Sequence, residues 1–360
     1  MSKSFLWGAA TSAYQVEGGI TNDFSDGGLD AGRACDHYNR FEKDFDLARS
    51  LDHNAYRFSI EWSRIEPEEG KFNQKEIDHY KKVIAALRER GLEPFVTLWH
   101  FTNPVWFARL GGWANKKAPD FFLRFAKKIV EELKDVKFWV TFNEPEIYAN
   151  HAYFFGVWPP KKKNAPIARR VLRNFIKAHK LFYHWSKNTR QSIQIGWVTN
   201  LSGGPTRWFF NFPNHRSFAA VGSEIDFIGL NYYQRIRFFP GRNLPRSDMG
   251  WEIYPKGIYE TINDLKKCNK PIYITENGIA DASDKRRSDF IKDHIQWVEK
   301  AMEEGADVRG YFYWSLIDNF EWHHGFGPRF GLVEVDYKTL ERKIRPSAQE
   351  YARIISHMVQ

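Results

Sequence analysis

The sequence predicts an α/β protein whose eight parallel strands close into a (β/α)8 barrel. Short runs rich in β-branched and aromatic residues recur eight times along the 360 residues, and each is typical of a buried strand. Amphipathic helical patterns lie between most of these runs, which is the element order of this barrel. No low-complexity tract or change of composition marks a linker, so we expect a single barrel domain over residues 1–360.

The predicted strands can be followed in order along the chain. They are LWGAATSAY near residue 6, AYRFSIEW near 55, EPFVTLWHF near 93, FWVTFNEP near 138, IQIGWVTN near 193, DFIGLNYY near 226, PIYITENG near 271 and GYFYWSLID near 310. A doubly wound open sheet is the alternative. It is disfavoured because no glycine-rich phosphate-binding turn follows the first strand.

Helical patterns fill the gaps between the strands. Apolar residues recur at helical spacing from Ile77 to Leu87, and Gly91 ends that pattern. A second pattern begins near Pro119, a residue type favoured in the first turn of a helix. Further patterns occur at residues 168–187, 257–268, 288–305 and 345–358.

Composition and charge exclude several classes of protein. Net charge is +9, but the basic residues are interspersed with acidic ones, and only PPKKKN at 159–164 forms a cluster, so we expect no nucleic acid partner. The two cysteines, Cys35 and Cys268, lie far apart and favour a reducing, cytoplasmic location. The N-terminus lacks an apolar leader and no segment has 18 consecutive apolar residues, so we expect no membrane association.

Polar residues gather where the predicted strands end, and in this barrel the strand carboxyl ends form the active site. Glu276, in YITENGI at 273–279, ends a buried strand, where an unpaired carboxylate would be costly. We therefore expect it to face the barrel mouth with the other polar residues found there. These are Gln15, Glu17, Arg57, Glu61, His100, Asn143, Glu144, Asn231, Tyr232, Tyr233, Trp314 and Asp318.

Two of these carboxylates, Glu144 and Glu276, suit the cleavage of a glycosidic bond, which needs one protonated acid and one ionised carboxylate. Glu276 would remain charged if Arg57 and a tyrosine hydroxyl lie beside it. Phe142 and Pro145 give Glu144 a drier setting, which favours its protonated form. The residues alone assign Glu276 as nucleophile and Glu144 as acid/base. They leave retention or inversion open, because the separation of the two carboxylates is not encoded locally.

Other chemistries fit the sequence poorly. His323 and His324 are adjacent, which suits no metal geometry, and no Cys or His partner stands at zinc spacing, so we expect no metal. A serine-centred triad would need a G-x-S-x-G elbow, and none is present.

Five motifs, in order along nearly the whole chain, resemble the family 1 glycoside hydrolases, the β-glucosidase and β-galactosidase family of clan A. They are FLWGAATSAYQVEGG, TFNEP, YITENG, YFYWSLIDNFEW and RFGLVEVDY. The resemblance implies retention through a covalent glycosyl-enzyme, with Glu144 as acid/base, Glu276 as nucleophile and no cofactor. It also implies a small β-glucoside, β-galactoside or β-fucoside as substrate. A silent sugar-binding barrel and a transglycosylase remain alternatives.

The same resemblance implies roles for the surrounding residues. Arg57 and Tyr233 would set the charge and orientation of the nucleophile, with Asn231 beside them. Trp314 would stack under the sugar ring, and the other substrate-binding residues would hold its hydroxyl groups. Those residues are Gln15, His100, Asn143, Glu321 and Trp322.

Two features depart from the family pattern. Phe101 follows His100 where most members have tryptophan, which removes an indole N–H. The connection between strands 5 and 6, residues 201–225, is short, so we expect a short or missing helix there and a more open site. Pro213 suggests an irregular segment, and we expect its aromatic residues to fold back over the barrel. They are Trp208, Phe209, Phe210 and Phe212.

Overall fold

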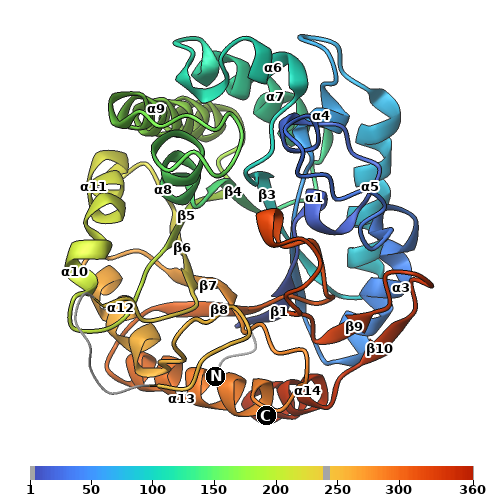
Figure 1. Ribbon diagram of the computed structural model, residues 1–360, viewed down its shortest axis with the longest axis vertical. Coiled ribbons are helices and arrows are strands. Elements are labelled where there is room, and N and C mark those ends of the chain that lie inside the picture. Colours follow the sequence, from blue (N-terminus) through green and yellow to red (C-terminus); the bar gives the residue numbers. More distant parts are fainter. Residues whose placement is uncertain (1–4, 238–243, 360) are drawn as a thin grey trace.

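The computed structural model describes residues 5–237 and 244–359, and within them eight parallel strands form a closed barrel (Figure 1). Each strand pairs with the next in sequence, and β8 pairs with β1 to complete the ring. The predicted (β/α)8 barrel is therefore confirmed. The strands are β1 Leu6–Ala10, β2 Ala55–Ser59, β3 Glu93–Trp99, β4 Phe138–Asn143, β5 Gln194–Asn200, β6 Phe227–Tyr232, β7 Ile272–Asn277 and β8 Val308–Trp314.

Helices form a ring around the strands, as Figure 1 shows in a view down the barrel. The larger ones are α3 His37–Ser50, α5 Gln74–Glu89, α7 Ala118–Glu132, α9 Ala165–Thr189, α11 Phe212–Val221, α12 Lys256–Lys266, α13 Arg287–Glu303 and α14 Pro346–Val359. The short helices are α1 Ala13–Val16, α2 Asp23–Asp26, α4 Trp62–Ile65, α6 Val105–Arg109, η1 Gly112–Ala114, α8 Pro145–Ala149, η2 Asn150–Phe154, α10 Arg207–Phe210 and η3 Trp322–His324. A small antiparallel pair consists of β9 Val333–Val335 and β10 Arg342–Ile344.

Local sequence explains where these helices begin. The side chain of Asn73 accepts a hydrogen bond from the backbone N–H of Lys75 and so caps α5. Pro119 occupies the first turn of α7, where its missing N–H costs no hydrogen bond. Both helices bury the apolar face that their spacing predicts.

Aromatic rings fill the barrel interior below the strand carboxyl ends. The ring of Phe95 on β3 stacks on Phe138 of β4 with a centroid distance of 5.3 Å, and it also contacts Phe227, Tyr273 and Phe312. Gly196 on β5 makes room for this cluster, because a Cβ atom there would lie 2.1 Å from the ring of Phe227. The rings fill the barrel interior as a packed core, which leaves the carboxyl-end mouth as the place for a ligand site in this fold.

The connection between β5 and β6 is short but more regular than its sequence predicts. It folds into α10 and the 10-residue α11. The expected short helix is confirmed, but the expectation that Pro213 would make the segment irregular is wrong. Pro213 lies in the first turn of α11, where proline is well tolerated.

The aromatic residues of this connection do not fold back over the barrel, contrary to expectation. Trp208, Phe209 and Phe212 are 69%, 52% and 56% exposed, and Phe210 borders the cavity at the barrel mouth. Phe218 and Val221 on the inner face of α11 are buried instead. The apolar burial of this segment therefore comes from α11 residues other than the predicted rings. We refer to Trp208, Phe209 and Phe212 as the aromatic patch.

Candidate active site

A cavity of about 530 Å³ opens at the carboxyl ends of the strands and contains both predicted catalytic carboxylates. Most of the predicted site residues line it, so the barrel brings together side chains that are hundreds of residues apart. Those residues are Gln15, His100, Asn143, Glu144, Tyr233, Glu276, Trp314, Glu321 and Trp322. Arg57 and Asn231 lie behind this wall and contact the carboxylates through hydrogen bonds.

Glu276 ends β7 and has both carboxylate oxygens occupied by donors. Its Oε1 accepts from Arg57 Nη1 at 2.5 Å, and its Oε2 accepts from the Tyr233 hydroxyl at 2.5 Å. Arg57 is itself buried, and its Nη2 donates to Asn143 Oδ1 at 2.6 Å. A buried guanidinium and a phenol on opposite oxygens hold the carboxylate in place.

Glu144 directly follows β4 and has a different environment. Its backbone φ is 45°, a left-handed conformation that is strained for a side chain of this kind, and Pro145 then begins α8. Burial and the charge of Glu276 raise the pKa of Glu144 to about 8, while the amides of Asn231 and Asn200 lower it. The two glutamates thus differ as an acid and a nucleophile must.

The side chain of Asn231 contacts Glu144, whereas the sequence predicts that it supports Glu276. The sequence places it among the residues that support Glu276, and its backbone does pair with that residue. Its side chain, however, donates to Glu144 Oε1 at 2.6 Å and to Asn143 Oδ1 at 3.2 Å. The hydroxyl of Thr275 donates to Asn231 Oδ1 at 2.7 Å and fixes that orientation. Only the neighbours across the barrel decide which way the amide turns.

Polar groups and indole rings form another part of the cavity wall. The Gln15 amide donates to the Phe320 carbonyl at 2.8 Å and reaches Glu321 Oε2 at 3.5 Å. Burial, then the charges of Glu276 and Glu144, raise the pKa of Glu321 to about 8.

Rings lie beside these polar groups. The His100 ring stacks on Trp314 and on Trp322, with interplanar angles of 17° and 14°. Burial lowers the pKa of His100 well below its usual value, so this imidazole is neutral. The Phe101 ring is tilted against Trp158 and meets Trp322 edge-on. It presents no hydrogen-bond donor to the cavity.

Four residues that the sequence places at the mouth serve the scaffold instead. Glu17 accepts from Arg64 and Tyr80, and Glu61 accepts from Ser63 and Thr102. None of the four lines the catalytic cavity, and each contacts residues outside that lining. The other two are Tyr232, which donates to the Tyr254 carbonyl, and Asp318, which pairs with Arg345.

Several cavity residues escape the sequence interpretation. Asn200 ends β5, the one strand for which no mouth residue is named, and its position at a strand end is the signal that could have identified it. Glu146 is buried beside the cavity, and its carboxyl makes no hydrogen bond of standard geometry to a described residue. Burial raises its pKa to about 7. Trp158 comes from a loop, Phe210 from α10 and Asn214 from α11, and no local pattern indicates the direction of these side chains.

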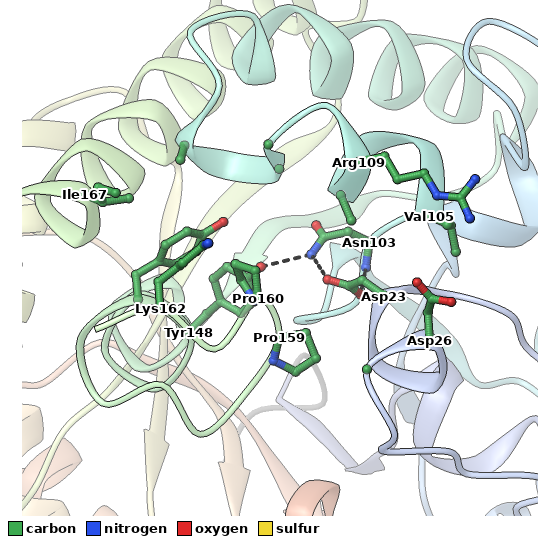
Figure 2. Close-up of a pocket in the computed structure, with 16 residues that line it drawn as sticks. Asp23, Asp26, Asn103, Val105, Arg109, Tyr148, Pro159, Pro160, Lys162 and Ile167 are labelled. Atoms are coloured by element: carbon green, nitrogen blue, oxygen red, sulfur yellow. Dashed lines mark hydrogen bonds between the residues drawn. The ribbon is translucent and has the colours of Figure 1, made fainter. Parts of the chain in front are cut away.

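A second cavity of similar size, about 530 Å³, lies between α2, α6 and the loop at Pro159 and Pro160 (Figure 2). Its buried acid, Asp23, accepts from both the backbone and the side-chain nitrogen of Asn103 at 2.7 and 2.8 Å. Asn103 also donates to the Tyr148 hydroxyl at 3.1 Å. The two cavities share no lining residue.

The described residues offer neither a metal centre nor a membrane span. In residues 5–237 and 244–359, no group of three or more His, Cys, Asp or Glu side chains is arranged to hold a metal ion. Over the same ranges, the helices are too short or too polar to cross a membrane.

This (β/α)8 barrel presents two glutamates of unlike environment in one mouth. That arrangement is typical of glycoside-cleaving enzymes. The profile of Glycosyl hydrolase family 1 matches residues 1–206 and 228–359. The chain therefore belongs to glycosyl hydrolase family 1 and is a glycoside hydrolase.

Individual relatives agree with this assignment. The 1,4-beta-D-glucan glucohydrolase of Thermotoga neapolitana is 34% identical over 434 aligned positions, which cover 99% of this chain and 98% of that protein. Beta-glucosidase A of Thermotoga maritima is also 34% identical, with 99% and 97% covered. Both alignments exceed the 360 residues of this chain, so it is a shortened member of the family.

Solved structures give the same result. The beta-glycosidase from Pyrococcus horikoshii superposes with a TM-score of 0.92 at 38% identity, covering 99% of this chain and 94% of that one. The beta-glucosidase from Thermotoga maritima in complex with methoxycarbonyl-substituted glucoimidazole gives 0.93 at 33% identity, covering 100% and 99%.

Proposed function

We propose that the protein is a retaining exo-β-glycosidase that releases the terminal sugar of β-glucosides, β-galactosides or β-fucosides. The observation that carries this proposal is the contrast between the two buried glutamates in one cavity. Glu276 accepts hydrogen bonds from two strong donors, Arg57 and Tyr233. Burial, by contrast, keeps Glu144 protonated up to about pH 8. One carboxylate is prepared to attack, and the other is prepared to give a proton.

In the first step Glu144 donates its proton to the glycosidic oxygen as the bond from C1 to that oxygen breaks. Glu276 attacks C1 from the opposite face and forms a covalent glycosyl-enzyme. In the second step water attacks C1 while Glu144 takes a proton from it, and Glu276 leaves. Two inversions give net retention of the anomeric configuration.

Other residues of the cavity wall supply sugar recognition in this scheme. Gln15, Glu321 and His100 provide hydrogen-bonding partners for ring hydroxyls, together with Asn143 and the indole of Trp322. Trp314 supplies an aromatic face for the apolar side of the ring. The sugar-like inhibitors named with the Thermotoga maritima beta-glucosidase structures, among them deoxynojirimycin, support a glucose-like ligand. The site residues use no cofactor in this mechanism.

Replacement of Glu276 by glycine provides the test. Glu276→Gly should lower turnover of an aryl β-glucoside by several orders of magnitude, because the covalent step has no nucleophile. Azide can enter the space left by the side chain, and it should restore turnover and yield a glycosyl azide of inverted configuration. Near-normal activity in this variant, or rescue that yields retained product, would contradict the assignment.

Two related outcomes can be separated by product analysis. A transglycosylase would transfer the sugar to an added alcohol or sugar acceptor faster than to water, and a silent sugar-binding barrel would bind aryl glycosides without cleaving any of them.

We also propose that residues 1–360 act as one domain in the cytoplasm. Cys268 is an exposed free thiol, and such a thiol persists best in a reducing compartment.

A further inference from the structure

The carboxyl of Glu144 is held from one side only. Its Oε1 accepts from Asn231 Nδ2 at 2.6 Å and from Asn200 Nδ2 at 2.9 Å. Its Oε2 accepts from no described residue, and Glu144 borders the open cavity. A protonated carboxyl carries its hydrogen on one oxygen, and an oxygen that faces two N–H donors is the unfavourable place for it.

Asn200 is fixed in this position from behind. It is the last residue of β5, and its backbone carbonyl accepts from Asn214 Nδ2 at 2.8 Å. The same Asn214 nitrogen donates to Thr199 Oγ1 at 2.8 Å. Asn214 is a buried residue of α11, so one amide clamps the end of β5 to that helix.

The clamp comes from a part of the chain that the family profile does not match. The family profile matches residues 1–206 and resumes at residue 228, so α11 and Asn214 lie outside the match. The short connection therefore does more than close the gap between β5 and β6. It supports the strand end from which Asn200 reaches the acid.

We propose that Asn200, clamped by Asn214, is a positioning residue that places the acid proton of Glu144 on Oε2, where it faces the leaving group. This proposal rests on the proposed acid/base function of Glu144. During glycosylation the Oε2 proton passes to the glycosidic oxygen, which keeps the electron pair of the broken bond. During deglycosylation the proton of the attacking water returns to Oε2.

The test compares Asn200→Ala and Asn214→Asp with Arg216→Ala, an exposed position on the same helix. Substrates are an alkyl β-glucoside, whose departure needs the proton, and a dinitrophenyl β-glucoside, whose departure needs little help. In Asn200→Ala, kcat/KM for the alkyl substrate should fall about tenfold or more. For the dinitrophenyl substrate it should fall by less than about threefold.

The pH profile gives a second readout that a merely structural role would not move. The Asn200 amide lowers the pKa of Glu144, so its removal should shift the alkaline limb to higher pH, by about half a unit or more. Asn214→Asp keeps the shape but loses the donor, so it should produce the same two changes to a smaller extent. Arg216→Ala should produce neither.

Titration of the ¹³C-labelled Glu144 carboxyl by NMR separates this proposal from the proposed function. An upward shift in the pKa in Asn200→Ala and Asn214→Asp, with near-native circular dichroism, is the expected result. Equal losses on both substrates with an unmoved pKa would overturn the positioning role. A wild-type enzyme that cleaves none of the glycosides would overturn the proposed function alone, because the titration still reports whether Asn200 acts on Glu144.

Discussion

At the scale of single residues, the pKa of Glu144 makes a direct prediction about pH. The acid form is needed to protonate the leaving group, so kcat/KM should be lost as pH rises through about 8, the raised pKa of this carboxyl. Glu144→Gln removes the titrating group. For substrates with activated leaving groups, the alkaline limb of kcat/KM should become flat, as measured by initial rates from pH 5 to 10.

Glu146 provides the matched control for that experiment. It lies two residues further along the chain, is equally buried, and has a pKa raised by burial to about 7. It is not assigned a proton transfer, so Glu146→Gln should retain an alkaline limb near 8. A limb that disappears in Glu146→Gln and persists in Glu144→Gln would reverse the assignment.

At the scale of elements, the aromatic patch on α10 and α11 exposes large apolar rings to solvent. Such patches promote self-association, and their side chains contribute little to folding stability. Replacing Trp208, Phe209 and Phe212 together by serine should lower concentration-dependent light scattering. It should change the melting temperature by no more than a few degrees.

Phe210 contacts the ring of Phe209 in the patch and offers the contrast. It borders the cavity, so Phe210→Ser should change KM for aryl glycosides, which the triple serine variant should leave near the wild-type value. Loss of folding in the triple variant would mean that these rings cover the barrel after all.

At the scale of the whole molecule, the aromatic plug in the barrel interior should dominate stability. Phe95 is fully buried and contacts four other rings on four strands. Phe95→Ala should cost about 3–5 kcal/mol, from lost apolar burial and the cavity left behind. The exposed Phe154 is the control, and Phe154→Ala should cost less than about 1 kcal/mol. Chemical denaturation measures both, and equal costs would contradict a central role for the plug.

The barrel, the order of its strands and the two glutamates that we propose as catalytic could all be predicted from the sequence alone. These features depend on local information: runs of β-branched residues, helical periodicity, and two short motifs that each carry their carboxylate. The position of a residue at the end of a strand was also sufficient to bring His100, Asn143, Tyr233 and Trp314 to one mouth.

The partner that each side chain meets depends on the tertiary structure and could not be predicted from the sequence. Arg57 and Glu276 are separated by 219 positions, and Asn231 and Glu144 by 87, so no local pattern relates them. Glu17 and Glu61 stand near strand ends, yet cations and hydroxyls behind the barrel attract them away from the mouth. Asn214 of α11 reaches the end of β5 through hydrogen bonds to Thr199 and Asn200, about 15 positions earlier in the chain. Side-chain direction is set by neighbours across the barrel, and these neighbours are defined only when the sheet closes.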